Sequence, residues 1–146
     1  MNFEELWAFL GRNPMLALAL AGITVAIIYT EVMRLTRGFK GLRPAELTAL
    51  INGESALVVD LRPGAEFEKG HIPGSKNVQM AQFDPENKAL ANAKALPVVA
   101  VCKPGVTAVD AAKRLRKAGF ERVYLLEGGI GAWQGADLPL AKGRGK

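Results

Sequence analysis

The chain has 146 residues, a formal net charge of +5, and 49% hydrophobic against 23% charged residues. This length allows one ordinary domain with a short appendage. One cysteine and one histidine are present, which excludes an intramolecular disulfide framework and any metal site built from several cysteines. We therefore expect neither a metal site nor a cofactor.

The N-terminal part contains a long apolar segment. No charged residue lies between Asn13 and Thr30, and the segment has no polar face. A helix from Met15 to Met33 would be about 28 Å long, close to the hydrocarbon thickness of a bilayer, and Pro14 suits the first turn of a helix. The sequence thus predicts one membrane span over about residues 14–33, within an anchor formed by residues 1–35.

Two other interpretations of this segment are weaker. A buried helix of a soluble domain normally carries polar residues along one side. A cleaved signal peptide needs a basic region before its apolar run, whereas only Arg12 accompanies Glu4 and Glu5 there. Small-residue pairs that resemble a cleavage site lie inside the run and not after it. An uncleaved anchor in the lipid bilayer is therefore the favoured interpretation.

Positive charge is concentrated just after the apolar segment. Only Arg12 precedes it, and four cations follow it, namely Arg34, Arg37, Lys40 and Arg43. The positive-inside rule then places the C-terminal part in the cytoplasm, and anionic headgroups would attract the same cations. Since no basic stripe with interleaved aromatics occurs elsewhere, nucleic acid is not an expected partner.

The rest of the chain has the size of one small domain. We expect a linker at residues 36–41, which contain two glycines and two cations, a domain at residues 42–140, and a flexible basic tail at residues 141–146. Residues 79–96 are rich in alanine and polar groups and predict a loop with one or two helical turns.

The domain alternates strand-like and helix-like segments. Short aliphatic runs at residues 56–60, 97–101 and 123–126 predict buried strands. Residues 44–52 and 108–118 have helical spacing, and a glycine follows each of them. Strands that alternate with helices indicate an α/β fold, with a parallel sheet covered by helices on both faces.

The single cysteine occupies a place where ligands bind in such sheets. Cys102 directly follows a predicted strand and precedes a predicted helix, beyond the carboxyl end of the strand. Backbone N–H groups of the loop, the freedom of Gly105, the helix N-terminus and the charge of Lys103 would hold an anion and lower the thiol pKa. Thr107 is placed to cap the helix. An inert, buried cysteine fits the local sequence equally well.

Asp60 and Arg62 end the first predicted strand and are retained as supporting residues. Asp60 is a candidate to hydrogen-bond the cysteine loop from beneath, since sites form at strand ends. A structural ion pair with Glu66 is the simpler explanation of Arg62. His71 is the only imidazole, but in its Gly-His-Ile-Pro-Gly turn we expect a hydrogen-bonded structural residue.

Several segments together resemble the rhodanese-like domain. They are Val58–Arg62, Glu66–Asn77, Cys102–Gly105 and Leu125–Trp133. Their order and spacing make the resemblance specific, and it covers nearly all of residues 42–140. One span followed by one such domain also resembles the bacterial inner-membrane, single-domain members of this family.

The resemblance implies a sulfurtransferase fold in which Cys102 is the catalytic nucleophile. The cysteine would take sulfane sulfur from a donor as a persulfide and pass it to a thiol acceptor, either a small molecule or a protein. Family members that transfer sulfur have six loop residues and phosphatase relatives have seven, and Cys102 to Thr107 gives six. The substrate-binding residues would be those of the loop, namely Lys103, Pro104, Gly105, Val106 and Thr107.

Two functions of different classes follow from these observations. The first is a sulfurtransferase or persulfide carrier that acts through Cys102, anchored in a bacterial-type inner membrane with its domain in the cytoplasm. The second is a non-catalytic rhodanese-like interaction module, tethered to bind a membrane-protein partner. The cysteine and the six-residue loop favour the first. Thr107 favours the second, because active members of the family often carry arginine at that position, which also makes thiosulfate the less expected donor.

Overall fold

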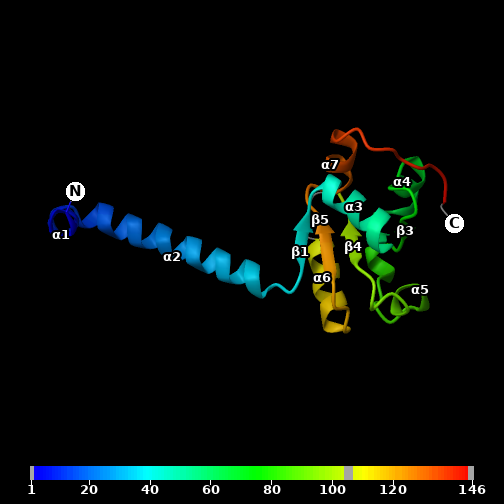
Figure 1. Ribbon diagram of the computed structural model, residues 1–146, viewed down its shortest axis with the longest axis horizontal. Helices are drawn as coiled ribbons and strands as arrows, with labels where there is room; N and C mark the ends of the chain where they lie inside the picture. The colour runs from blue at the N-terminus through cyan, green and yellow to red at the C-terminus, as the bar shows by residue number, and fades with distance from the viewer. Residues whose placement is uncertain (1, 104–106, 145–146) are drawn as a thin grey trace. The chain divides into compact units, whose positions relative to one another are not determined.

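The computed structural model describes residues 2–103 and 107–144. The chain divides after Arg37 into an N-terminal helical unit and a C-terminal α/β unit (Figure 1).

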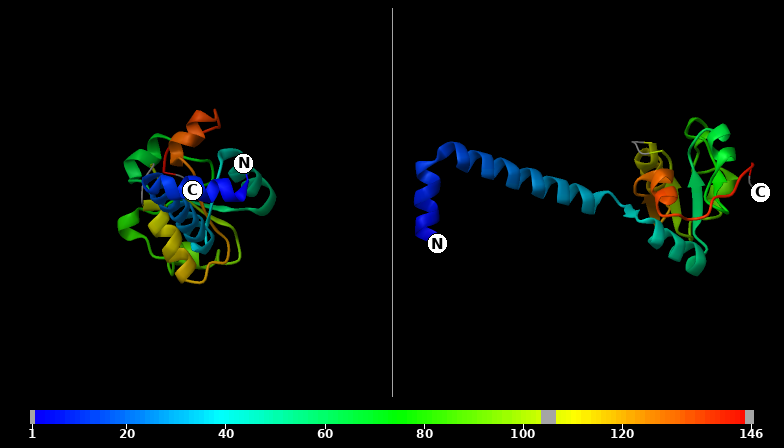
Figure 2. Two further views of the ribbon diagram at one scale, coloured as in Figure 1. Left: turned by 90° about the vertical axis from the view of Figure 1, so that its left-hand side faces the viewer. Right: turned by 90° about the horizontal axis from the view of Figure 1, so that it is seen from above.

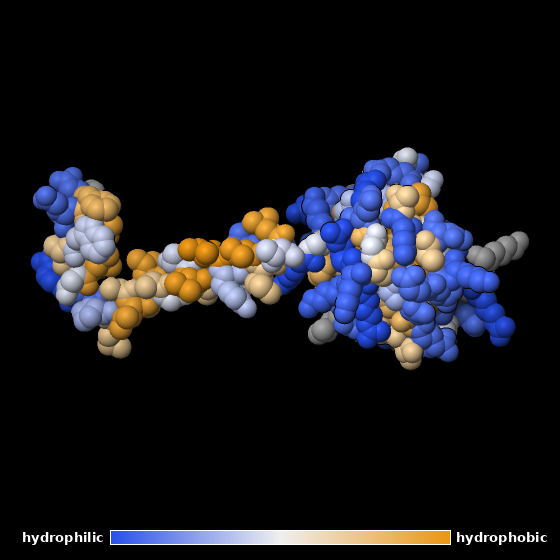
Figure 3. Space-filling model, turned by 90° about the horizontal axis from the view of Figure 1, so that it is seen from below, coloured by the Kyte–Doolittle hydropathy of each residue, from blue (hydrophilic) through white to orange (hydrophobic). Residues whose placement is uncertain are grey.

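The N-terminal unit consists of two helices, α1 (Phe3–Arg12) and α2 (Pro14–Thr36). Helix α2 has 23 residues with a mean hydropathy of 2.0 over its most apolar window, so by length and composition it is able to cross a membrane. Figure 3 shows hydrophobic side chains over most of this segment. The helix begins at Pro14 and continues past Met33 to Thr36, and Glu31 and Arg34 form an ion pair of 2.5 Å near its end. Helix α1 was not predicted.

The C-terminal unit is built on a parallel sheet of five strands, as expected for the α/β class. In spatial order the strands are β1 (Lys40–Leu42), β5 (Val123–Leu126), β4 (Val98–Val101), β2 (Leu57–Asp60) and β3 (Lys76–Asn77). All neighbouring pairs run parallel. Every residue of β4 is buried, which is typical of a parallel strand covered on both faces.

Helices cover the two faces of this sheet and give it two hydrophobic cores. They are α3 (Pro44–Glu54), α4 (Gly64–Lys69), the 3₁₀ helix η1 (Met80–Gln82), α5 (Lys88–Ala91), α6 (Thr107–Lys117) and α7 (Gly129–Gly135). Neighbouring strand residues point to opposite faces: Val59 packs in one core with Leu115 of α6. Val58 packs in the other with Leu47 of α3 and Trp133 of α7. Figure 2 gives two further views of these layers.

The edges of the predicted elements differ from the structure in instructive ways. Lys40 and Gly41, expected in the linker, belong to β1 and pair with Tyr124 and Leu125 of β5. Three residues are too few to show a hydrophobic periodicity, and this edge strand is defined only by its pairing with β5. The sequence alone therefore did not predict it. Helix α3 does not stop at Gly53 but continues to Glu54, and Ser55 ends it with a left-handed φ of 54°.

The residues expected to form a free tail are partly held by the domain. Ala141 and His71 form an isolated antiparallel bridge, with backbone hydrogen bonds of 2.8 and 2.9 Å in the two directions. The Gly143 N–H donates to the Glu68 carbonyl at 2.9 Å. This contact joins segments about 70 residues apart, so local composition does not reveal it.

Candidate functional site

The candidate site lies at the carboxyl ends of β2 and β4. These strands pair in register, with Asp60 opposite Val101, and the Leu61 N–H donates to the Val101 carbonyl at 2.8 Å. Because Cys102 follows Val101 directly, the register brings Asp60, Arg62 and Cys102 to one edge of the sheet. This grouping agrees with the expectation that sites form at strand ends.

Cys102 is a free cysteine whose side chain is almost enclosed, with 7% exposure. Its thiol donates to the Lys103 carbonyl at 2.7 Å. Burial raises the pKa of this thiol, the Ala108 N–H lowers it by donating to the sulfur, and the Asp60 carboxylate raises it. The net direction is upward, so the protonated thiol is the favoured resting state.

This result corrects the expectation that the loop lowers the thiol pKa. A helix amide does stabilise the thiolate, since Ala108 lies in the first turn of α6. Burial outweighs it, because moving a thiolate away from water costs more than one backbone donor returns. The sequence pattern identified the donors but carried no measure of how deeply the sulfur is buried.

The cation of the loop is already engaged. Lys103 Nζ lies 3.0 Å from Glu66 Oε1, with the lysine side chain 68% exposed and the glutamate 32% exposed. Glu66 belongs to α4, 37 residues away in the chain. The carboxylate offsets the charge of Lys103, the residue after the cysteine, so an anion approaching this edge meets less attraction than Lys103 alone would give.

A buried ion pair supports the strand end beneath the cysteine. Asp60 and Arg62 are 1% and 6% exposed, and their closest atoms, Arg62 Nη2 and Asp60 Oδ2, lie 2.7 Å apart. Arg62 also donates through Nε to both carboxylate oxygens and through Nη2 to the Gly70 carbonyl. The arginine therefore pairs with Asp60 and not with Glu66, because its guanidinium folds back toward its own strand end.

Two further groups fix this corner of the fold. The Asn77 amide donates to the carbonyls of Asp60 and Arg62 at 3.1 and 2.8 Å. His71 has the structural role expected for it: its ring stacks on Phe67 with centroids 3.7 Å apart, and Nδ1 lies 2.8 Å from the Phe67 carbonyl.

Helix α7 approaches the backbone of the cysteine closely. The Ile130 N–H donates to the Cys102 carbonyl at 3.1 Å, and Gly129 has a φ of 59°. A Cβ on Gly129 would lie 2.0 Å from that carbonyl oxygen, so no other residue fits. Gly129 thus lets α7 come close enough for the Ile130 N–H to hold the carbonyl of Cys102 in place.

The remaining loop residues are only partly described. Thr107 is exposed and is the first residue of α6. The predicted substrate-binding residues Pro104, Gly105 and Val106 lie outside the described residues. Within the described part of the chain, no group of three or more histidine, cysteine, aspartate or glutamate side chains could hold a metal ion.

Sequence reasoning missed the roles of Glu66, Asn77 and Gly129. Each acts on the site through a contact with a segment distant in the chain, and no local spacing marks such a contact. Only the parallel strand order, once known, places β3 and α4 beside the end of β2.

Alkylation of Cys102 by iodoacetamide should have a raised pH midpoint in the folded chain. The rate should rise only above the ordinary thiol range of about pH 8.5, because burial favours the protonated sulfur. By linkage, the free energy of unfolding should keep its full value below that pH. It should fall as the pH rises through it, because the unfolded thiol ionises first. Rates measured from about pH 7 to 10, with the same chain unfolded in guanidinium as control, test this. A folded midpoint at or below the unfolded one would contradict it.

Glu66→Gln should make Cys102 more reactive toward an anionic reagent. The substitution leaves the charge of Lys103 uncompensated, so alkylation by iodoacetate should rise relative to alkylation by neutral iodoacetamide. The expected gain is roughly two- to threefold at low salt, as for a solvent-screened charge, and should shrink as salt is added. Glu68→Gln is the matched control, because Glu68 lies on the same helix but pairs with Arg144. An equal gain in both variants would argue against a local effect.

Comparison with known proteins agrees with this architecture. A family model for the rhodanese-like domain matches residues 43–136. The YibN protein of Escherichia coli strain K12 is 39% identical over 142 residues, which cover 97% of this chain and 99% of YibN. The thiosulfate sulfurtransferase GlpE of Shewanella oneidensis is 36% identical over 102 residues, covering 68% of this chain and 96% of GlpE.

A solved structure adds support at the level of the fold. The crystal structure of a thiosulfate sulfurtransferase from Pseudomonas aeruginosa matches with a TM-score of 0.64 and 28% identity, covering 72% of this chain. This chain corresponds to 20% of that protein's length. Given the family match over the sheet and its helices, the chain belongs to the rhodanese-like domain family.

Proposed function

We propose that this chain is a membrane-anchored sulfurtransferase that carries sulfane sulfur as a persulfide on Cys102 and delivers it to a thiol. The observation that carries the proposal is the position of Cys102, a free cysteine at the carboxyl edge of the parallel sheet of a rhodanese-like domain. Relatives named thiosulfate sulfurtransferase support the same reaction class.

The proposed reaction consists of two displacements. The Cys102 thiolate attacks the terminal sulfane sulfur of a donor persulfide or polysulfide; a Cys102–sulfur bond forms, the donor's sulfur–sulfur bond breaks, and the donor leaves as a thiolate. The acceptor thiolate then attacks the outer sulfur of the Cys102 persulfide and releases Cys102 as a thiolate. One sulfur atom moves from donor to acceptor, with no external oxidant or reductant.

Residues around the sulfur have separate tasks in this scheme. The Ala108 N–H stabilises the thiolate that each step requires or releases. We assign substrate binding to the loop, whose members are Lys103, Pro104, Gly105, Val106 and Thr107. Asp60 and Arg62 support the loop from the strand end by neutralising each other where no water can do so.

Burial of the sulfur suits a sulfur carrier, because it protects the thiol from unspecific reactions. A protonated, nearly enclosed thiol is oxidised slowly, because oxidation follows thiolate character and exposure. The same burial, with the raised thiol pKa, is the observation that favours the second candidate function, a non-catalytic module that binds a membrane-protein partner. Chemistry at Cys102 distinguishes the two.

We further propose that α2 anchors the chain in a bacterial-type inner membrane as a single span. The E. coli relative YibN matches 97% of this chain, a share that includes the helical unit. The positive-inside rule supports a cytoplasmic domain. Only Arg12 precedes α2, whereas cations gather at its end and after it, namely Arg34, Arg37, Lys40 and Arg43.

Incubation of the full chain in mild detergent with a polysulfide should add the mass of one sulfur atom. The gain should be absent in Cys102→Ser and should disappear when a small thiol is added to the wild type, with the acceptor recovered as its persulfide. Intact-mass spectrometry measures all three. No gain on the wild type, or an equal gain on Cys102→Ser, would sink the sulfurtransferase and leave the interaction module.

Carbonate washing of membranes from cells that make the full chain should leave it in the pellet. Deletion of residues 1–37 should release the remaining compact unit, because α2 is removed with them. Protease added to intact spheroplasts should spare the domain and should digest it only after lysis. Release of the full chain by carbonate would disprove the anchor, and digestion without lysis would reverse its orientation.

A further inference from the structure

Helix α1 carries an apolar stripe along one face and its charged residues on the opposite side, with the exposed Phe9 between the two. Phe3, Leu6, Trp7 and Leu10 follow the i, i+3, i+4, i+7 spacing that puts side chains on one face of a helix. The Phe3 and Trp7 rings meet edge to face, with centroids 6.0 Å apart. The charged residues lie on the other side, namely Glu4, Glu5 and Arg12.

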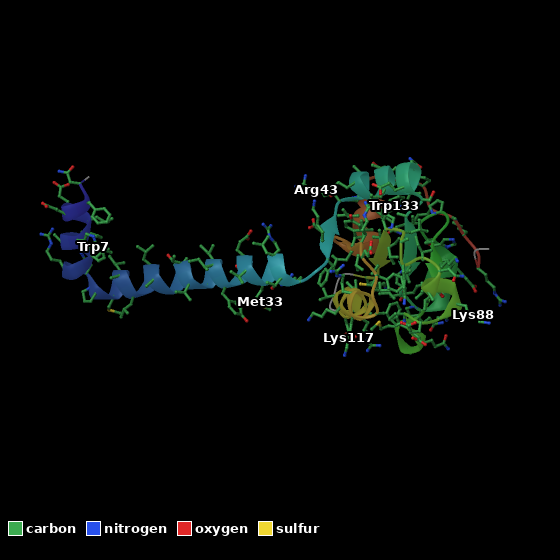
Figure 4. The ribbon with its side chains drawn as sticks, turned by 60° about the horizontal axis from the view of Figure 1, so that its bottom comes forward. Trp7, Met33, Arg43, Lys88, Lys117 and Trp133 are labelled. Atoms are coloured by element: carbon green, nitrogen blue, oxygen red, sulfur yellow. The ribbon has the colours of Figure 1, made fainter. Side chains whose placement is uncertain are left out.

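The two aromatic side chains of the stripe are exposed, whereas Leu6 and Leu10 are half-buried. Phe3 and Trp7 are 74% and 62% exposed, and none of the described residues of α1 is buried. Figure 4 shows Trp7 projecting from α1. Leaving two large aromatic side chains in water is unfavourable, so the stripe calls for an apolar environment.

Helix α1 is a separate helix and not the first part of α2. Asn13 ends it, with a φ of −128° and a ψ of 70°, and the Asn13 side chain donates to the Phe9 carbonyl at 2.9 Å. Pro14, which has no N–H to donate, begins α2. Asn2 and Glu5 form a capping box at the start of α1. Figure 2 shows α1 turned across the direction of α2.

The length of α2 places α1 at the membrane surface. Its 23 residues extend about 34 Å, which suffices for a hydrocarbon core of about 30 Å without help from α1. One residue, Asn13, separates the two helices. The C-terminal end of α1 therefore lies within a few ångströms of the interface. Trp side chains favour this layer, where the ring meets acyl chains and the N–H meets water.

We propose that α1 is an interfacial helix that lies along the bilayer surface at the N-terminal end of α2. Its stripe of Phe3, Leu6, Trp7 and Leu10 enters the boundary between headgroups and acyl chains, and Glu4, Glu5 and Arg12 stay in water. This inference rests on the proposed anchoring by α2. Because the charged side of α1 holds two carboxylates and one guanidinium, apolar burial drives the contact and anionic lipid does not strengthen it.

The experiment measures the depth of Trp7 with the full chain in phosphatidylcholine vesicles. Brominated lipids with bromine near the headgroup, or near the chain end, quench tryptophan at those depths. Trp133, the other tryptophan, is 3% exposed within the domain, and the Trp7→Phe variant supplies its background. Trp7 should emit at short wavelength and should be quenched most by the shallow bromine. Its quenching should not change when phosphatidylglycerol is added.

A matched pair of variants tests the stripe itself. Leu6→Glu places a charge on the apolar face and should reduce shallow quenching of Trp7 about twofold or more, as expected for a carboxylate in the apolar layer. Ala8→Glu adds the same residue on the polar side, between Glu4 and Arg12, and should leave the quenching unchanged.

Three outcomes would overturn the proposal. Trp7 quenched by aqueous iodide and not by bromine lies in water. Trp7 quenched most by the deep bromine belongs to the span. Trp7 that emits at short wavelength without bromine quenching packs on protein. Carbonate washing of the same vesicles distinguishes these outcomes from failure of the anchor. If the chain is retained, any of the three outcomes refutes only the interfacial helix. If the chain is released, the anchor itself is refuted.

Discussion

The pairing of β2 with β4 is the constraint on which the candidate site depends. Four residue pairs hold the two strands parallel, from Leu57 opposite Val98 to Asp60 opposite Val101. A slip of one residue would turn every side chain of a strand to the other face, and would send Val58 and Val59 into each other's cores. The register is therefore fixed by the two hydrophobic cores, and it carries the position of Cys102 with it.

Electrostatics at this edge keep the sulfur protonated yet able to ionise. Asp60 would be a strong obstacle to a thiolate if it were alone, since both charges would lie at one poorly hydrated strand end. Arg62 neutralises it through several hydrogen bonds, so that burial is the main cause of the raised thiol pKa and Asp60 a smaller one. The Ala108 N–H supplies a fixed donor that costs no reorganisation when the thiolate forms.

The sequence predicted the central part of the fold better than its edges. Runs such as Val98–Val101 are aliphatic throughout because helices cover both faces of the sheet, and burial on both faces leaves a strong pattern. Strands β1 and β3 have three and two residues, too few for any period, and exist only through their partners. Strand ends could likewise be predicted, and with them Cys102 and Asp60.

The contacts at the site that could not be predicted join residues far apart in the sequence. Glu66 meets Lys103 across 37 residues, and Gly129 meets the Cys102 carbonyl across 27 residues. The partner of Arg62 was missed for another reason: Asp60 is a local neighbour, but its burial makes it the stronger partner. Glu66 is partly buried and already pairs with Lys103, whereas a buried Asp60 without a partner would be costly.

The two units of the chain differ in where their apolar side chains are buried. The domain buries its apolar residues against its own sheet. Helix α2 buries none of its described residues in protein, although an isolated apolar helix in water gains little stability from its backbone alone. In the proposed anchored state a bilayer would supply the missing burial, which suits a helix whose backbone groups bond along its own length. A domain anchored as proposed would meet partners in the same membrane at a raised effective concentration. Weak, transient contact with such an acceptor would then suffice for sulfur transfer, and a deeply held thiol becomes compatible with a useful rate.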